Sequence, residues 1–172
     1  MAGPLSVALL ASLALVPVPS GLEATNPYKV EGAWSYFIND NLCTAGMVQL
    51  SDNAVLMMAF DASKKSFLVS FTEKRKAAIA DSQREMGIRL HRTSGALDEG
   101  WEDVWFTPLS WTEDSLLWVS QPMEEVALHD FNDYDTLVFI DHGRTAGMFR
   151  GKGNQAAVRE LRRCAKEQKA KN

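Results

Sequence analysis

The sequence predicts a mainly β domain: a β-rich α+β fold in which an antiparallel sheet or sandwich of six to eight strands is closed by a C-terminal helix. Short apolar segments with alternating side chains are separated by polar turns over most of the chain. Two apolar runs flank a polar five-residue loop at 61–65, the pattern of a hairpin. Residues 155–168 carry apolar side chains at helical spacing.

The N-terminal segment has the features of a secretory signal peptide. Its apolar run, residues 5–16, is shorter than the roughly 20 residues that span a bilayer. Small residues at Ser20 and Ala24 offer cleavage sites. We therefore expect a signal peptide over residues 1–24, cleaved near 20–24, and a single exported domain over residues 25–172. The expected location is the periplasm or the extracellular medium, with no stable membrane insertion after cleavage.

The expected elements follow from the apolar runs and the turn residues between them. Strands are predicted at 30–38, 43–50, 54–60, 66–71, 88–92, 116–119, 135–140 and 145–149. Thr107-Pro108 and Glu113-Asp114 are predicted turns, and residues 73–81 are a candidate short helix. In the C-terminal helix, one face is predicted to carry Ala157, Val158, Leu161 and Cys164. Asn154 is the expected cap at its start.

The chain has two cysteines, Cys43 on a predicted strand and Cys164 on the predicted helix. In an oxidising compartment we expect them to form a disulfide that ties the helix to the sheet. A loop of about 100 residues closed in this way is worth about 4.7 kcal/mol in the chain-entropy model. The alternative, a redox or nucleophilic cysteine, has neither a C-x-x-C motif nor a neighbouring histidine to support it.

The charges are unevenly distributed although the net charge is only −4. Between Asp98 and Asp141 there are twelve acidic residues and no Lys or Arg, whereas residues 64–92 and the C-terminus are basic. An acidic face attracts a basic protein partner and argues against nucleic-acid binding. The alternative is that these blocks pair with one another and that most tryptophans are core residues. The candidate binding surface comprises Trp101, Glu102, Asp103, Trp105, Glu124, Glu125, Asp130 and Asp133.

A catalytic centre finds little support in the sequence. Asp141 and His142 form a possible acid–base pair, with Ser120 or Ser66 as the nucleophile, but no G-x-S-x-G motif is present. His142 falls in a predicted hairpin turn. We predict no catalytic residues, and a hydrolase that uses Asp141 and His142 is the alternative function.

Metal binding is equally weakly indicated. The three histidines have none of the spacings typical of zinc sites. Residues 130–135 cluster oxygen ligands of the kind that calcium prefers, but Asp135 stands where a calcium loop of the EF-hand type has glycine. We therefore expect no metal and no cofactor.

The C-terminal segment Met148-Phe-Arg-Gly-Lys-Gly-Asn-Gln-Ala-Ala-Val-Arg-Glu-Leu-Arg-Arg-Cys164 resembles the ending of small exported alphaproteobacterial proteins grouped with the invasion-associated locus B-like family. In those proteins a strand leads through a Gly-rich polar turn into a short helix that ends in a cysteine, and the first cysteine lies on an early strand, as Cys43 does. The resemblance covers about the last 30 residues well. It implies a periplasmic β-rich domain and brings no catalytic residues with it.

These observations together predict a non-enzymatic periplasmic or secreted binding or accessory domain, of a kind associated with virulence, that uses the acidic Trp-rich surface. An inhibitor of another enzyme is a further alternative. It would need an exposed rigid loop, for which residues 98–100 and 141–144 are the candidates.

Overall fold

The computed structural model describes residues 27–39, 42–49, 52–74, 82–92, 97–112, 114–132, 134–151 and 154–170, without the side chains of residues 39, 97–100 and 102. The predicted leader and its cleavage site lie outside these residues. The described part is mainly β, with one antiparallel sheet and a C-terminal helix, which confirms the predicted fold class. The sheet has eleven strands, so the prediction of six to eight was too low.

The strands are β1 (Lys29–Glu31), β2 (Trp34–Asn39), β3 (Leu42–Gln49), β4 (Ala54–Asp61), β5 (Ser66–Lys74), β6 (Arg84–His91), β7 (Leu97–Thr112), β8 (Ser115–Ser120), β9 (Met123–Glu124), β10 (Thr136–Asp141) and β11 (Arg144–Arg150). The helices are α2 (Ala127–Asp130) and α3 (Asn154–Lys169). The strand order is β1-β2-β3-β4-β5-β8-β7-β6-β10-β11, and β9 pairs with the start of β5. All of the pairings are antiparallel, so hairpins between neighbours build most of the sheet.

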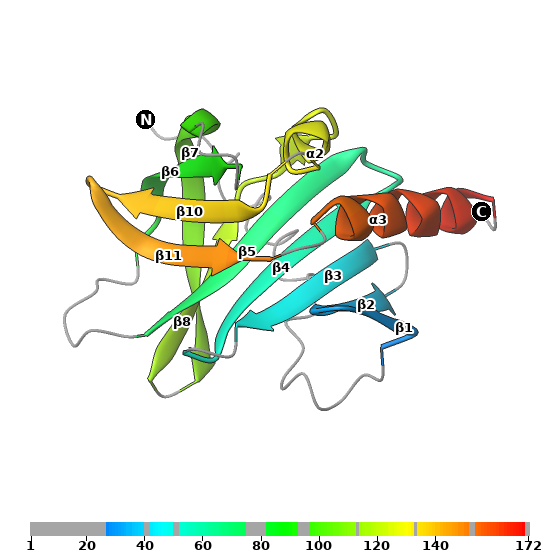
Figure 1. Cartoon of the computed structure of the whole chain (residues 1–172), viewed down its shortest axis with the longest axis horizontal. Helices are drawn as coiled ribbons and strands as arrows, with labels where there is room; N and C mark the ends of the chain where they lie inside the picture. The colour runs from blue at the N-terminus through cyan, green and yellow to red at the C-terminus, as the bar shows by residue number, and fades with distance from the viewer. Residues whose placement is uncertain are drawn as a thin grey trace, which may run out of the picture.

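β5 is the strand at which the sheet changes partners. Its residues 66–71 pair with β4, and its residues 70–74 pair with β8. The far end of the sheet then returns, because β11 contacts β5 although no ladder of hydrogen bonds joins them (Figure 1). Gly147 on β11 permits this approach, since a Cβ atom there would lie 2.9 Å from the ring of Phe71. The sheet is therefore strongly curled around its own inner face.

The space enclosed by this curl is filled by aromatic rings. Phe71 stacks on Phe139 with ring centroids 4.0 Å apart and planes at 13°. Phe106 and Phe149 meet these rings edge to face. All four side chains are buried, and aromatic pairs of this kind are each worth about 0.5–1.5 kcal/mol beyond the area they bury. The curled part of the sheet thus has a rigid aromatic core.

α3 covers β2, β3 and β4 on the same inner face (Figure 1). The predicted apolar face of the helix is confirmed, because Ala157, Val158, Leu161 and Cys164 are all buried. Asn154 does not act as the expected cap. Its side-chain amide donates to the carbonyl group of Tyr134, and its Oδ1 atom has no hydrogen-bond partner.

Two local predictions were wrong for identifiable reasons. The predicted strand 30–38 is two strands, because Gly32 adopts a φ of 62° and turns the chain between β1 and β2. The predicted turn at Thr107-Pro108 lies inside β7. Proline fits there because β6 pairs with β7 only as far as Phe106, so one side of the strand has no β6 partner at residue 108.

The remaining expectations agree closely with the structure or lie outside its description. The hairpin of 54–60 and 66–71 is β4–β5, and the predicted strands at 43–50, 88–92, 116–119, 135–140 and 145–149 correspond to β3, β6, β8, β10 and β11. The candidate helix at 73–81 begins with residues that belong to β5, and residues 75–81 lie outside the described part. The short elements β9 and α2 were not predicted from the sequence.

Candidate functional site

The predicted disulfide is present between Cys43 on β3 and Cys164 on α3. Their sulfur atoms are 1.97 Å apart and their Cα atoms 6.0 Å apart, which confirms the pairing. Both residues are buried beneath the helix, at about 1% exposure. The bond fastens α3 to the sheet across a sequence separation of 121 residues. Because these are the only two cysteines of the chain, no free thiol is left to act as a nucleophile.

The two tryptophans of the candidate surface occupy opposite faces of β7. Trp101 lies opposite the buried Ile88 and stacks on Phe131 with ring centroids 5.2 Å apart, so it packs against the core. Trp105 points outward and is 43% exposed. The two rings therefore do not form a single aromatic surface, and Trp105 is the one available to a partner.

A β-bulge places an acidic residue beside Trp105. The pairing of β6 with β7 shifts at Gly87, and Asp103 adopts a φ of 61°, a conformation that aspartate tolerates better than most residues. Asp103 and Trp105 are both exposed on either side of the buried Val104. Glu85 on β6 lies directly opposite Trp105 and is also exposed. We call Glu85, Asp103 and Trp105 the Trp105 surface.

The other acidic candidates lie on different elements. Gln121 precedes the first of them, Glu124, and lies beside Trp105: its backbone N–H donates to the Trp105 carbonyl group at 2.6 Å. Glu124 is exposed on β9, and Glu125 is exposed in the turn before α2. Asp130 ends α2 and is half-buried. The side chain of Glu102, and Asp133 as a whole, lie outside the described residues, so their places in the surface stay predictions.

The outer face of the sheet carries an apolar cluster that was not predicted from the sequence. Val55 and Met57 of β4 pack there with Leu117 and Val119 of β8, and all four are buried. The half-buried side chains of Leu109 and Trp111, on β7, pack against this cluster. The outer face is thus apolar along β7 and becomes exposed at Trp105.

Asp141 and His142 lie at the β10–β11 turn. Nδ1 of His142 is 2.5 Å from one Asp141 oxygen, and the Arg84 guanidinium donates to the other at 2.6 Å. Burial acts to raise the pKa of Asp141, but the hydrogen bonds from His142 and Arg84 outweigh burial and leave the pKa below its usual value. Asp141 is therefore an ionised anchor for both side chains. Arg84 also lies over the ring of Trp118, 5.6 Å from its centroid.

Among the residues that the structure describes, no nucleophile lies beside His142. Its side chain is 78% exposed, and within the described part of the chain its sole polar partner is Asp141. Ser120 is buried, and its hydroxyl oxygen accepts a hydrogen bond from the backbone of Val69. Ser66 lies on β5 in register with Glu124. Neither serine is placed to complete a catalytic triad with His142.

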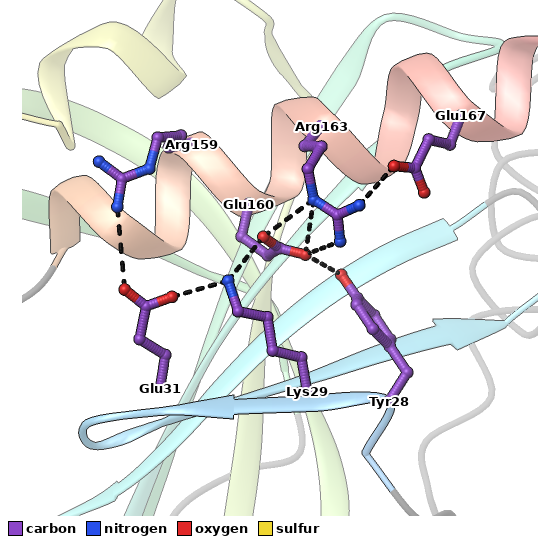
Figure 2. A network of polar contacts seen from close by, with 7 residues as sticks. All are labelled: Tyr28, Lys29, Glu31, Arg159, Glu160, Arg163 and Glu167. Atoms are coloured by element: carbon purple, nitrogen blue, oxygen red, sulfur yellow. Dashed lines mark hydrogen bonds and ion pairs between the residues drawn. The ribbon is translucent and has the colours of Figure 1, made fainter.

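Among the described residues, a network of polar contacts joins β1 and the residue before it to α3 (Figure 2). Glu160 on α3 is only 5% exposed through its side chain. Its carboxylate accepts hydrogen bonds from the Tyr28 hydroxyl and from Nζ of Lys29, each at 2.9 Å. Arg163 donates to it from Nε and Nη2, and Arg163 also pairs with Glu167.

These contacts determine the ionisation of the network. The Arg163 hydrogen bonds are the main cause that lowers the pKa of Glu160 to about 2, against the opposing effect of burial. Burial and the hydrogen bond to Glu160 raise the pKa of Tyr28. At the edge of the network, Glu31 pairs with Lys29 at 2.7 Å and with Arg159 at 3.8 Å (Figure 2). At neutral pH Glu160 is therefore ionised and the Tyr28 hydroxyl keeps its proton, and their contacts hold β1 against α3.

The sequence alone does not reveal this network. Glu160 and Arg163 have the i,i+3 spacing of an ordinary surface pair on a helix. The distinguishing fact is that Glu160 faces Tyr28, which is 132 residues away in sequence. One feature of the sequence does point to Glu160. Helical spacing places it near Ala157 and Leu161, which are buried, so its carboxylate lies close to the core face of the helix.

Among the residues that the structure describes, no three His, Cys, Asp or Glu side chains are grouped so that they could hold a metal ion. Within the same residues, neither helix has the length and apolar character needed to cross a membrane. Comparisons of the chain with protein-family models, with curated proteins and with solved structures found no match. The geometry of the chain's own residues therefore carries the functional argument.

Proposed function

We propose that the chain is a non-enzymatic binding domain of the periplasm or the extracellular medium, and that its Trp105 surface holds a basic side chain of a partner protein. The apolar leader and the resemblance to invasion-associated locus B-like proteins support the location. The buried Cys43–Cys164 disulfide is compatible with an oxidising compartment. The binding function rests on the exposed Trp105, which has the exposed Glu85 opposite it on β6 and the exposed Asp103 two residues before it on β7.

The chemistry of this surface favours arginine as the group recognised. A guanidinium stacks on an aromatic face, where the attraction is about 0.5–1 kcal/mol at an exposed site. Residues directly opposite in an antiparallel pair have Cβ atoms about 4.5–5.5 Å apart, so the Glu85 carboxylate lies within reach of a cation on the indole ring. Asp103 adds a second negative charge on the same strand. The apolar stripe formed by Leu109 and Trp111 would contact the rest of the partner.

A hydrolase is the less favoured alternative, because His142 contacts Asp141 and no nucleophile within the described residues. An inhibitor that inserts the 141–144 turn into another enzyme would use the same exposed His142. Neither alternative requires Trp105, so variants of Trp105 separate them from the proposed function.

The test is a titration of the oxidised protein with a tri-arginine peptide, followed by calorimetry and by tryptophan fluorescence. The matching tri-citrulline peptide is the neutral control, since it keeps the shape of the side chain and lacks the charge. We expect the arginine peptide to bind, and its affinity to fall as salt rises, because exposed charges are screened over about 8 Å at physiological ionic strength.

Variants locate the binding. Trp105→Ala is expected to weaken the affinity about two- to fivefold, the size of one exposed cation–π contact. Glu85→Gln should weaken it as well, whereas Trp105→Phe should retain part of it. Asp114→Asn is the matched control, because Asp114 is an exposed carboxylate of the same acidic segment that lies in the turn after β7, away from Trp105 in the sequence. Equal binding of the two peptides, or equal loss in Asp114→Asn, would remove the Trp105 surface from the proposal.

A further inference from the structure

A small cleft lies between the β4–β5 hairpin, the turn before α2 and the second half of α3. Its volume is about 170 Å³. The walls carry four cationic side chains: Lys65 from the hairpin and Arg162, Lys166 and Lys169 from the helix. Glu125, from the turn before α2, is the one acidic side chain that lines it. We call this group the basic cleft.

The cations of the basic cleft are unpaired within the described residues. Lys65, Lys166 and Lys169 make no side-chain hydrogen bond and no ion pair there. The Nη2 atom of Arg162 is buried and has no hydrogen-bond partner, which is rare for a buried polar atom in a folded protein. By contrast, Arg163 on the neighbouring face of α3 pairs with two carboxylates (Figure 2).

The arrangement on the helix concentrates like charges. Arg162, Lys166 and Lys169 have i, i+4 and i+7 spacing, so they share one face of α3, and like charges at this spacing destabilise a helix. Cations in the last turn do favour the helix dipole, which accounts for Lys166 and Lys169. The helix dipole does not account for Arg162, which lies further from the end of the helix, or for Lys65, which comes from another element. An anion in the cleft would satisfy all four.

The floor of the cleft is apolar. Phe60 and Ala165 line it and are themselves nearly fully buried, and Ala62 completes it. A ligand that fits must therefore combine an anionic group with an apolar part. A phosphate offers acceptor oxygens in several directions, which suits donors that arrive from both the hairpin and the helix better than a planar carboxylate does.

We propose that the basic cleft is a binding site for a phosphate monoester that carries an apolar group. Lys65, Lys166 and Lys169 would supply point charges around the phosphate, Arg162 would donate hydrogen bonds to it, and the ring of Phe60 would contact the apolar part. The ester is either a free small molecule or the phosphomonoester head group of a lipid such as phosphatidic acid. This site is separate from the Trp105 surface, so either proposal can fail without the other.

The first experiment titrates the oxidised, isotope-labelled protein with phenyl phosphate and follows the backbone amide resonances. Benzyl alcohol is the neutral probe, and benzoate is the planar anion. We expect saturable binding of phenyl phosphate, with shifts confined to residues 60–65, 125 and 162–169, weaker binding of benzoate and none of benzyl alcohol. Absence of phenyl phosphate binding, or shifts scattered over the surface, would overturn the proposal. Equal binding of benzoate would overturn the assignment to phosphate.

A double variant within the cleft and a control variant outside it test the location. The double variant Lys65→Gln/Lys166→Gln should lose at least tenfold in affinity. Lys64→Gln removes one charge from the same hairpin, but Lys64 pairs with Asp61 and does not line the cleft, so its affinity should stay within twofold of the parent protein. Thermal unfolding of each variant shows that it is folded. A loss in Lys64→Gln as large as in the double variant would reduce the effect to general surface charge and overturn the site.

A second arm distinguishes the two sources of the ester. The protein is sedimented with vesicles that contain phosphatidic acid, a phosphate monoester, and with phosphatidylcholine vesicles, whose phosphate is a diester. Sedimentation with phosphatidic acid that phenyl phosphate reverses supports a lipid head group. Phenyl phosphate binding with no sedimentation supports a free ester.

Discussion

The Tyr28 hydroxyl donates a hydrogen bond of 2.9 Å to the carboxylate of Glu160, and this contact joins the first described strand to the last helix. Lys29 approaches the same carboxylate from β1, and Arg163 approaches it from α3 itself. Glu160 is thus a buried carboxylate at the centre of a cluster in which every partner is a donor, although Lys29 and Arg163 are themselves partly exposed. The stability of the domain should depend on this one side chain more than on any exposed ion pair of α3.

Replacing Glu160 by glutamine tests that dependence. Glu160→Gln keeps the shape but removes the charge that three donors share, and hydrogen bonds to a charged group contribute about 1.5–3 kcal/mol each in favourable cases. We expect urea unfolding to show a loss of about 2–3 kcal/mol. Glu167→Gln, which affects only a half-exposed pair with Arg163, should cost less than about 1 kcal/mol. Equal losses in the two variants would contradict a central role for Glu160.

The same carboxylate predicts how stability depends on pH. The pKa of Glu160 is about 2 in the folded protein and 4.5 for the unperturbed group. A depressed pKa gives stability that is fully present above pH 4.5 and is lost as the pH falls toward 2, here about 3 kcal/mol. Asp61 and Asp141 also have lowered pKa values and act in the same direction.

The contribution of Glu160 is therefore measured as a difference. The free-energy gap between the parent protein and Glu160→Gln should be constant from pH 6 to 8 and should narrow below about pH 4.5, in chemical unfolding followed by far-ultraviolet circular dichroism. A gap that stays constant down to pH 3 would show that Glu160 titrates normally.

Gly147 is predicted to be intolerant of a side chain. A Cβ atom there would lie 2.9 Å from the buried Phe71 ring and 3.1 Å from that of Phe149, and neither ring has room to move. Gly147→Ala should destabilise the domain by about 1–3 kcal/mol, the usual cost of overpacking. Gly46→Ala is the control, because its nearest contacts would be 3.7–3.9 Å away. Thermal unfolding gives the midpoint of each of the two variants. Similar midpoints for Gly147→Ala and Gly46→Ala would count against the close approach of β11 to β5.

Loss of the disulfide is expected to cost about 2–5 kcal/mol. The double variant Cys43→Ala/Cys164→Ala is preferable to either single one, because it leaves no unpaired thiol. Its stability should match that of the parent protein under reducing conditions. Thiol titration of the native protein should detect no free cysteine, and the detection of two would contradict the bond.

Cleavage of the leader on export predicts the mass of the exported protein. Material recovered from the periplasm or the culture medium should lack about 20–24 N-terminal residues, because the apolar segment 5–16 would be removed with the leader. Intact-mass spectrometry reads the cleavage site directly. A full-length protein found only in the cytoplasm would contradict the proposed location.

Local sequence patterns were sufficient to predict the strands and the helix in which apolar residues recur at the spacing of one buried face. The β4–β5 hairpin and α3 were predicted within a few residues, because their apolar side chains report a single buried face. The disulfide followed from counting two cysteines. The long strand β7 was not predicted, because its proline suggested a turn, and only the place where β6 ends makes Pro108 acceptable.

The candidate surface could be predicted only in part, because burial of a tryptophan depends on which face of its strand it occupies. In a regular strand Trp101 and Trp105, four residues apart, would share one face. The bulge at Asp103 places them on opposite faces, and no local signal in the sequence marks the bulge. Long-range polar contacts are harder still. The Glu160 network and the basic cleft combine residues from elements far apart in the chain, which spacing rules within one helix cannot detect.

The attachment of β1 to α3 also constrains the order in which the chain can complete its fold. Tyr28 and Lys29 are synthesised first among the described elements, yet their shared partner Glu160 arrives near the end. Contacts between such distant segments carry a large loop-closure cost and form late. β1 therefore cannot make its native contacts with α3 before the helix has been synthesised and has packed on the sheet. Late attachment of β1 suits the export that we propose, because a chain that crosses a membrane unfolded completes its fold only afterwards.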